Sequence, residues 1–394
     1  MELTAIYHRP ESEYAYLYKD KTMHIRIRTK KDDIESINLH YGDTFIFLED
    51  HYEAIKEMVK VTSDVLFDYW QAEVSVGYAR LQYLFELKDK QGQSILYGDK
   101  GCVENTLENL HYEGNGFKIP YIHEIDACHV PDWVAEMVWY QIFPERFANG
   151  NPEISPKGAL AWDSLIKPKT RDFFGGDLQG IIDHLDYLQD LGITGLYLCP
   201  IFESPSNHKY NTTDYFEIDH HFGDKKIFRK LVEEAHQRGM KIMLDAVFNH
   251  IGDQSLQWQD VLKHGGKSEY KDWFHVQEFP VTKDKLGNPR KLPYHTFAFA
   301  SYMPKLNTAN PQVRDYLLKV ATYWIEEFDI DAWRLDVANE VDHQFWRDFR
   351  KAVLAKKPDL YILGEVWHTS QPWLNGDEFH AVMNYPLSDS IKDY

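Results

Sequence analysis

The first 120 residues alternate between apolar and polar positions, with the period of two that is typical of β-strands. The clearest alternating segments are residues 23–29, 74–78 and 81–87, and turn sequences lie near residues 42–43, 88–89 and 98–99. This pattern predicts an antiparallel β-sandwich without helices. We expect it to cover residues 1–122, with a linker near residues 119–132.

The pattern changes at Val138, where short apolar runs begin to alternate with amphipathic segments. It predicts strands at residues 138–143, 195–201, 241–248, 330–337, 360–367 and 381–385, and helices at residues 178–191, 226–238, 311–328 and 343–356. Alternation of this kind favours a parallel sheet, and six units in series favour a TIM barrel over an open sheet. No Gly-x-Gly-x-x-Gly follows the first strand, which argues against dinucleotide binding.

Six strands are two fewer than a (β/α)8 barrel needs to close. The sequence ends at Tyr394, shortly after the sixth strand. We therefore expect residues 123–394 to form an incomplete (β/α)8 TIM barrel, and the chain to be a piece of a longer protein. Residues 1–394 alone are expected not to be a competent catalyst.

The connection over residues 251–306 is too long for an ordinary barrel loop. It holds many charges together with the aromatic side chains Trp258, Trp273, Tyr294 and Phe297. We predict that it forms an inserted loop subdomain over the C-terminal mouth of the barrel, where the active sites of TIM barrels lie.

Two carboxylates end neighbouring predicted strands, Asp336 after the fourth and Glu365 after the fifth. A right-handed crossover would set these strands side by side, so carboxylates at matching heights should lie about 5 Å apart. A retaining glycosidase spaces its acid and nucleophile in this way. Arg334 shares the face of Asp336 and is expected to keep it ionised, while Glu365 in a more apolar setting holds a proton. The alternative is a structural ion pair between strand ends.

Composition narrows the class of partner. The chain has 394 residues, with 43 Lys and Arg against 62 Asp and Glu, a formal charge of −19 that disfavours nucleic acid or an anionic membrane as a partner. Aromatic residues make up 15%, which suits either a sugar-binding cleft or large cores. The three cysteines form no Cys-x-x-Cys pair, and no leader or long apolar run is present, so we expect a reducing, cytoplasmic location.

Three further polar clusters lie at the predicted C-terminal mouth of the barrel. Residues 245–250 end the third strand with Asp245, Asn249 and His250, although Asp245 alone would also serve to tether loops. Residues 208–215, which include His208 and Tyr210, follow the second strand and alone differ little from a polar loop. Residues 149–177 are rich in Asn, Asp and Gly and offer the oxygen ligands that Ca²⁺ takes, although most such loops bind nothing.

Together these stretches resemble the α-amylase superfamily, and within it the neopullulanase, cyclomaltodextrinase and maltogenic amylase group. Four motifs occur in the family's order and carry the resemblance: residues 245–250, 303–307 (Met-Pro-Lys-Leu-Asn), 333–336 and 364–367. Residues 337–340 (Val-Ala-Asn-Glu), 143–147 and 173–177 are also similar to the group.

The resemblance implies roles for individual residues. Asp336 would be the nucleophile and Glu365 the general acid/base, with Arg334 orienting Asp336. Sugar contacts would come from Asp245, His250, His208, Tyr210, Asn339 and Glu340. A calcium site would use Asn149, Asn151, Gly175 and Asp177, but Ile154-Ser155 stands where many relatives have Asn-Asp. The family's third catalytic carboxylate lies at the end of the seventh strand, and no residue here matches it.

The resemblance also implies a function. We expect an intracellular hydrolase that retains configuration at α-1,4 and possibly α-1,6 glucosidic bonds of maltodextrins, cyclodextrins and pullulan, with possible transglycosylation. A homodimer through the N-terminal domain is expected, since residues 41–45 resemble a loop that covers the partner's cleft. Two alternatives stay open: a non-catalytic carbohydrate-binding or scaffold protein of the same fold, and a metal-dependent barrel enzyme, which needs three or four clustered ligands.

Overall fold

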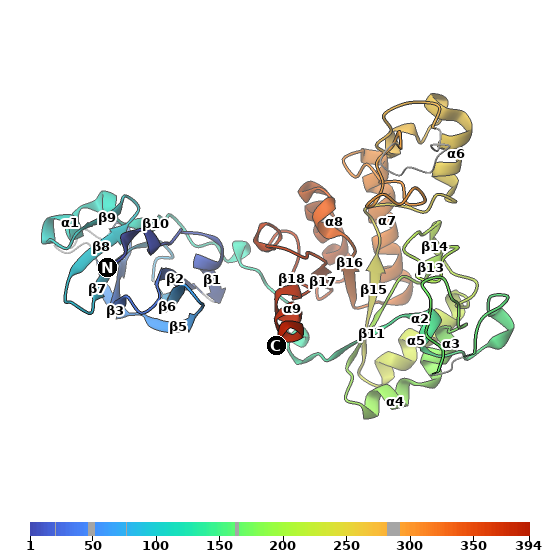
Figure 1. The fold of residues 1–394 in the computed structure, drawn as a ribbon, viewed down its shortest axis with the longest axis horizontal. Coiled ribbons are helices and arrows are strands. Elements are labelled where there is room, and N and C mark those ends of the chain that lie inside the picture. Colours follow the sequence, from blue (N-terminus) through green and yellow to red (C-terminus); the bar gives the residue numbers. More distant parts are fainter. Residues whose placement is uncertain (20, 46–51, 76, 162–164, 282–291) are drawn as a thin grey trace. The chain divides into compact units, whose positions relative to one another are not determined.

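A computed structural model describes residues 1–19, 21–45, 52–75, 77–161, 165–281 and 292–394 (Figure 1). The chain divides into two compact units, Met1–His129 and Val130–Tyr394, and each is described by itself. Among the described residues, every helix is too short or too polar to cross a lipid bilayer.

The N-terminal unit is the predicted antiparallel β-sandwich. One sheet has the order β1 (Ala15–Lys19), β2 (Thr22–Lys30), β6 (Phe67–Ser75) and β5 (Val59–Ser63). The other has the order β4 (Ala54–Glu57), β3 (Ile34–Gly42), β7 (Leu81–Asp89), β8 (Ser94–Gly98) and β9 (Gly101–Glu104), with β10 (Phe117–Ile119) paired to β7. Alternate residues point between the sheets, as the period-two pattern requires, and form a buried core that includes Ile25, Ile27, Ile37, Leu39 and Phe85.

Two predictions for this unit are wrong in detail. The strand predicted at 74–78 is the end of β6, which begins at Phe67, and Tyr78 lies in a turn. The unit also contains a helix, α1 (Leu107–His111), because the Thr106 side chain caps it by accepting the Asn109 N–H. Short 3₁₀ turns occur as η1 (Leu3–Ala5), η2 (Ser12–Tyr14), η3 (Glu113–Asn115) and η4 (Glu124–Asp126).

The C-terminal unit contains the predicted six-stranded parallel sheet. Its strands pair in chain order: β11 (Trp139–Ile142), β12 (Gly195–Leu198), β15 (Lys241–Ala246), β16 (Ala332–Leu335), β17 (Tyr361–Gly364) and β18 (Ala381–Val382). This half-barrel is consistent with the expected TIM barrel. A small hairpin, β13 (Phe202–Glu203) with β14 (Asp214–Ile218), follows the second strand of the sheet.

The longer helices of this unit each bury one apolar face. The helices outside the insertion are α2 (Pro144–Phe147), α3 (Leu178–Asp183), α4 (Leu185–Asp190), α5 (Lys225–Gln237), α7 (Pro311–Phe328), α8 (His343–Lys356) and α9 (Tyr385–Asp393). Apolar faces are buried by α5, α7 and α8, whereas α9, which follows the last strand, buries no residue. In α7 the Asn310 side chain accepts the Gln312 and Val313 N–H groups ahead of Pro311, as a helix start requires. Its buried stripe includes Leu317, Val320, Ala321 and Trp324.

Two elements of this unit differ from prediction. The helix expected over 178–191 is two helices, because His184 leaves helical geometry at ψ 10° and its ring nitrogen Nδ1 lies 2.8 Å from the Gly180 carbonyl. The strand expected over 381–385 ends at Val382, because Asn384 caps α9 by accepting the Leu387 N–H.

The insertion predicted over 251–306 has its own small core. Trp258 of α6 (Leu256–His264) packs on Phe274 and Tyr294, with ring centroids 4.7 and 4.6 Å apart. Residues 282–291 of this prediction lie outside the described residues. In the described part of the unit, the 3₁₀ turns are η5 (Asp132–Glu136), η6 (Pro152–Ile154), η7 (Gly265–Lys267), η8 (Lys271–Trp273), η10 (Ala338–Glu340) and η11 (Gln371–Trp373).

Candidate active site

The paired carboxylates stand at matching heights, as predicted. Strands β16 and β17 pair in parallel with Leu335 opposite Gly364, so Asp336 and Glu365 are the next residues on each strand. The Asp336 N–H donates to the Ala246 carbonyl at 3.1 Å, and the Glu365 N–H donates to the Leu335 carbonyl at 2.9 Å. These bonds fix both backbones at the C-terminal edge of the sheet.

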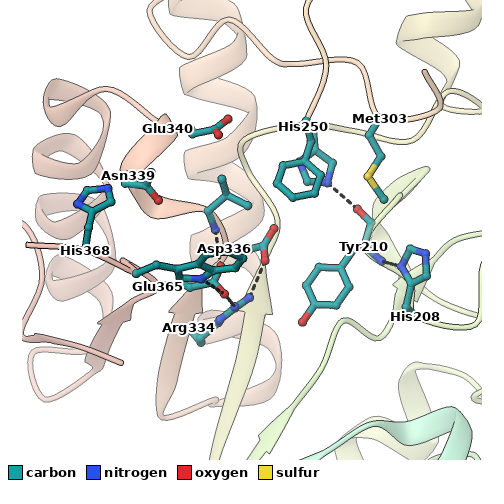
Figure 2. A pocket seen from close by; sticks show the side chains of 13 residues that line it. His208, Tyr210, His250, Met303, Arg334, Asp336, Asn339, Glu340, Glu365 and His368 are labelled. Atoms are coloured by element: carbon teal, nitrogen blue, oxygen red, sulfur yellow. Dashed lines mark hydrogen bonds and ion pairs between the residues drawn. The ribbon is translucent and has the colours of Figure 1, made fainter. Parts of the chain in front are cut away.

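One guanidinium joins three carboxylates at the pocket, and Figure 2 shows two of them, Asp336 and Glu365, with Arg334. Arg334 Nη1 lies 2.8 and 3.0 Å from the two Asp245 oxygens and 2.7 Å from Asp336 Oδ1. Its Nη2 lies 2.7 Å from Glu365 Oε1. All four side chains are buried, with at most 8% of each residue exposed. The expected separation of about 5 Å between the catalytic carboxylates stays a prediction, but both bind the same cation.

The prediction for where the proton resides is wrong. Burial, together with the negative charges of Asp245 and Glu365, raises the pKa of Asp336 to about 8 despite Arg334. Burial also opposes ionisation of Glu365, but Arg334, the Val337 N–H and the Trp367 and Tyr385 side chains together lower its pKa. Burial also raises the pKa of Asp245, so the directions of these shifts favour a proton on Asp336 or Asp245 over one on Glu365. That proton must pass to Glu365 before Glu365 can act as an acid.

Donors that surround Glu365 explain this reversal. The Val337 N–H donates to Oε2 at 3.0 Å, and the Trp367 Nε1–H and Tyr385 hydroxyl donate to Oε1 at 3.0 and 2.9 Å. Val337 has a φ of 47°, and its N–H donates to the Glu365 side chain at this left-handed turn. A carboxylate with so many donors is stabilised in its charged form.

Asp336→Asn should stabilise the folded chain, and more so at high pH. Between an unfolded pKa of about 3.9 and the folded value of about 8, the folded state keeps a proton that the unfolded state has lost. The free energy of unfolding therefore falls as pH rises through this window. Asparagine removes the Asp336 share of that dependence, so we expect a gain on the order of 2 kcal/mol at pH 8 and little gain at pH 4.

Urea denaturation of both proteins across this pH range measures the effect. Asp272→Asn, at a carboxyl that lies outside this cluster, is the control and should show the parental pH dependence. An Asp336→Asn protein that loses stability in parallel with the parent from pH 4 to 8 would contradict the assigned proton.

The predicted sugar contacts gather around one pocket of about 410 Å³. Of the predicted residues it is lined by Arg334, Asp336, Glu365, His208, Tyr210, His250, Asn339 and Glu340. Asp245 lies beneath them instead, where it accepts the Tyr197 and Tyr210 hydroxyls at 2.6 and 3.0 Å. It therefore positions Tyr210 and Arg334 and is not itself part of the pocket lining.

Several residues of this region were missing from the predicted site. Phe297 and Met303 come from the insertion, and Trp367 and His368 follow the fifth strand. The Phe297 ring stacks on His250 with centroids 5.0 Å apart, which ties the insertion to the pocket. Trp367 is 67% exposed, so its flat face is open to a sugar. The motif at 364–367 contains Trp367, but only the fold shows which way its ring faces.

The four residues of the implied calcium site do not fit that ion as they stand. The Asp177 oxygens accept the backbone N–H groups of Gly150, Asn151 and Gly180. Asn151 Oδ1 accepts the Glu153 N–H, and Asn149 Nδ2 donates to Ser155 Oγ at 2.8 Å next to Gly175. Because the side-chain oxygens of Asp177 and Asn151 are engaged by backbone N–H groups, the loop as it stands does not offer the full set of oxygens that a hard cation requires, and we derive no chemistry from calcium.

The metal-dependent alternative finds no support at the pocket. Among the described residues, the one trio of His, Cys, Asp or Glu side chains within mutual ligand reach is Asp219, His220 and His221. None of these three lines the pocket.

Comparison with known proteins identifies close relatives. Residues 141–394 match the model of the α-amylase catalytic domain, and residues 1–123 match that of the α-amylase N-terminal Ig-like domain. The intracellular maltogenic amylase of Bacillus subtilis is 56% identical over 100% of this chain and 66% of its own length. Neopullulanase 2 of Thermoactinomyces vulgaris is 46% identical over 99% of this chain and 65% of its own.

A solved cyclomaltodextrinase structure has the same fold. It aligns with a TM-score of 0.93 at 48% identity, over 100% of this chain and 66% of that one. The chain thus spans about two thirds of the length of the relatives that it matches.

Proposed function

Since the chain belongs to the α-amylase family, we propose that its paired carboxylates hydrolyse α-glucosidic bonds with retention of configuration. The observation that carries the proposal is the Arg334 guanidinium, which binds Asp336 and Glu365 at once on the floor of a pocket lined by sugar-contacting residue types. Adjacent strand ends would place the two acids on either side of a scissile glycosidic bond.

The reaction proceeds in two displacements. Glu365 donates its proton to the glycosidic oxygen while Asp336 Oδ attacks the anomeric carbon, so the C–O bond to the leaving sugar breaks as the glycosyl-enzyme ester forms. Glu365, now ionised, then removes a proton from water or a second sugar, whose oxygen attacks the anomeric carbon and releases Asp336. Attack by a second sugar gives transglycosylation in place of hydrolysis.

The substrates we propose are maltodextrins, cyclodextrins and pullulan, cleaved at α-1,4 and also α-1,6 bonds. Support comes from the names of the relatives and from the exposed Trp367 and the Phe297 ring at the pocket. Product analysis of the complete enzyme on cyclodextrin, pullulan and starch tests the proposed substrates. NMR that identifies the anomer formed first tests retention of configuration. First products with the β configuration would contradict retention.

A non-catalytic carbohydrate-binding protein of the same fold is the competing proposal. The intact Asp336, Glu365 and Arg334 cluster speaks against it, because a pure binding role does not require a buried acid pair. Mass spectrometry after incubation with a mechanism-based glucosyl inactivator separates the two: the enzyme gains one glucosyl group on Asp336, whereas a binding protein gains none.

Calcium should not stabilise the loop at residues 149–177. Asp177 and Asn151 already accept backbone N–H groups with their side-chain oxygens, so an entering ion would have to compete with these bonds. We expect calcium added to chelator-stripped protein to leave the thermal midpoint unchanged. A reversible rise of several degrees would show that the loop rearranges around the ion. Ser155→Ala, which frees the Asn149 side-chain amide from its bond to Ser155 Oγ, is the matched variant.

We propose that the enzyme is a homodimer in which Phe45 of the N-terminal unit contacts sugar. Asp43 is buried, accepts the Phe45 N–H at 2.8 Å and binds Arg80 at 3.0 Å. Arg80 stacks 4.9 Å from the Phe45 ring, which stays 59% exposed and thus available to a partner. Deleting residues 1–122 from the complete enzyme should give a monomer by light scattering. A monomeric intact enzyme would overturn the proposal.

We also propose that the enzyme is located in the cytoplasm. Support comes from the Bacillus subtilis relative, which is named intracellular, and from cysteines without a Cys-x-x-Cys pair. Fractionation of the source cells tests it, with the activity expected in the cytosolic fraction.

A further inference from the structure

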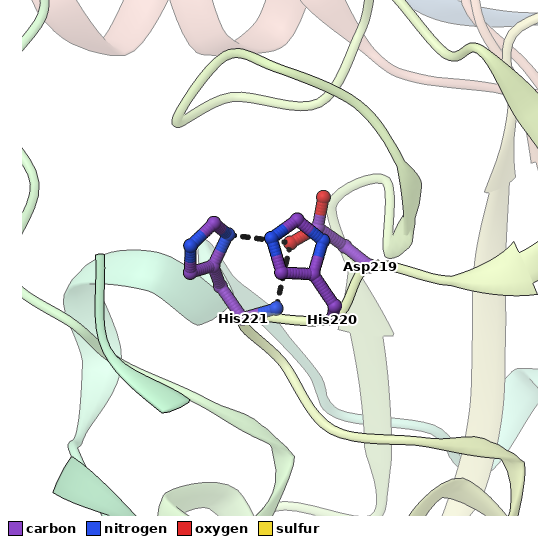
Figure 3. A group of neighbouring side chains, drawn as sticks. All are labelled: Asp219, His220 and His221. Atoms are coloured by element: carbon purple, nitrogen blue, oxygen red, sulfur yellow. Dashed lines mark hydrogen bonds and ion pairs between the residues drawn. The ribbon is translucent and has the colours of Figure 1, made fainter. Parts of the chain in front are cut away.

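A group of metal-ligating side chains lies just after β14, away from the catalytic residues (Figure 3). Asp219 is fully buried, and three groups fix its carboxylate. Oδ2 accepts the Ser204 N–H at 3.0 Å and lies 2.7 Å from Lys209 Nζ, while Oδ1 accepts the His221 N–H at 3.0 Å. Oδ1 also lies 3.4 Å from the Nδ1 ring nitrogen of His221.

The His220 ring is held as a metal-ligating histidine is held. Its Nδ1 lies 3.0 and 3.1 Å from the two Glu203 oxygens, and its backbone N–H donates to the same carboxylate at 3.2 Å. A carboxylate on one ring nitrogen fixes the tautomer and leaves a lone pair on the other, an arrangement found behind most histidine ligands. Within the described chain, Nε2 has no hydrogen-bond partner of its own.

His221 presents a buried nitrogen without a hydrogen bond. Its Nδ1 is shielded from solvent and has no hydrogen-bond partner among the described residues. It lies 3.4 Å from Asp219 Oδ1, which is long for an N–H···O bond. Two ligands that each lie about 2.1 Å from a tetrahedral Zn²⁺ are themselves about 3.4 Å apart. The separation therefore suits a shared metal better than a shared proton.

We propose that Asp219 Oδ1, His220 Nε2 and His221 Nδ1 bind one divalent transition-metal ion of the Zn²⁺ class. One ligand atom from each residue lies within 4.8 Å of the others, and the two rings lie with centroids 3.9 Å apart. His220 is the exposed member, so a small rotation of its ring closes the remaining distance, and water takes the fourth position. Two imidazoles and one carboxylate select Zn²⁺, Ni²⁺ or Cu²⁺ over Ca²⁺ and Mg²⁺.

Lys209 limits the affinity of the site for a metal ion and connects the site to the catalytic pocket. Its ammonium neutralises part of the Asp219 charge, so we expect a dissociation constant in the micromolar class and no tighter. Lys209 stands between His208 and Tyr210, which both line the catalytic pocket. A metal on Asp219 would therefore brace the segment that carries these two sugar contacts, without touching the reacting atoms.

Calorimetric titration of Zn²⁺ into chelator-stripped protein with alkylated cysteines tests the proposal. We expect one ion per chain, and at least tenfold weaker binding for His220→Ala and for His221→Ala. Glu203→Gln, which alters the carboxylate behind the His220 ring and backbone N–H but none of the three proposed ligands, should weaken binding about tenfold. The matched control is His264→Ala, an exposed histidine bonded to Asp260 at 2.7 Å without a third ligand, which should bind as the parent does.

Cobalt gives an independent readout. Co²⁺ at the same site should produce the visible absorption of a tetrahedral nitrogen and oxygen environment in the parent and in His264→Ala, and not in His221→Ala. The proposal is overturned if the folded parent binds no Zn²⁺ in the micromolar range. It is equally overturned if the His220→Ala and His221→Ala proteins, with parental circular dichroism, bind Zn²⁺ as tightly as the parent.

Discussion

Asp336→Asn in the complete enzyme should abolish formation of the glycosyl-enzyme and lower kcat on the order of 10⁴-fold. The amide cannot form the ester, while its size keeps the contact with Arg334 Nη1 that now lies at 2.7 Å. Sugar binding should persist, since His208, His250 and the pocket aromatics are untouched. The measurement combines steady-state kinetics with mass spectrometry of protein treated with a mechanism-based glucosyl inactivator.

A second pocket carboxylate controls for loss of charge. Glu340 lines the same pocket and is partly exposed, so Glu340→Gln also removes one negative charge there. This variant should still gain one glucosyl group per chain, whatever its effect on KM. Labelling of the Asp336→Asn protein, or kcat within tenfold of the parent, would show that another residue is the nucleophile.

Much of the fold follows from local periodicity. The six parallel strands and the long helices α5, α7 and α8 are marked by apolar runs and amphipathic stripes that the structure buries. The prediction of the start of β6 failed because a polar residue there faces the core. Asp68 interrupts the alternation at the start of β6, yet it is buried because the Asp32 N–H, Ser63 hydroxyl and Lys60 ammonium satisfy it.

The identity of the site residues could be predicted, but their protonation could not. Asp336, Glu365 and Arg334 stand at strand ends, where the order of elements alone brings them together. Which carboxylate carries the proton depends on groups that lie far from it along the chain. Asp245 of β15 pairs with the Arg334 guanidinium, which therefore neutralises Asp336 less completely. The Tyr385 hydroxyl of α9 donates to Glu365, which lies 20 residues away in the sequence. No local pattern encodes those two contacts.

Glu365→Gln should produce a defect that depends on the leaving group. With maltodextrins, whose leaving oxygen needs a proton, kcat should fall on the order of 10³-fold, because general acid and base assistance are both lost. With α-glucosyl fluoride, whose departure needs little protonation, the first displacement should proceed at a rate near that of the parent. The glycosyl-enzyme should then accumulate, since no base activates water.

Azide distinguishes the acid/base role from a purely structural one. It attacks without a base, so it should restore turnover of α-glucosyl fluoride by Glu365→Gln and yield a glucosyl azide of retained configuration. It should do nothing for Asp336→Asn, which forms no intermediate. Glu365 also anchors Arg334, Val337 and Tyr385, and a lost anchor would slow every substrate alike. Equal losses on maltodextrin and fluoride without azide rescue would therefore assign Glu365 to positioning Arg334, and the proton donor would have to be sought elsewhere.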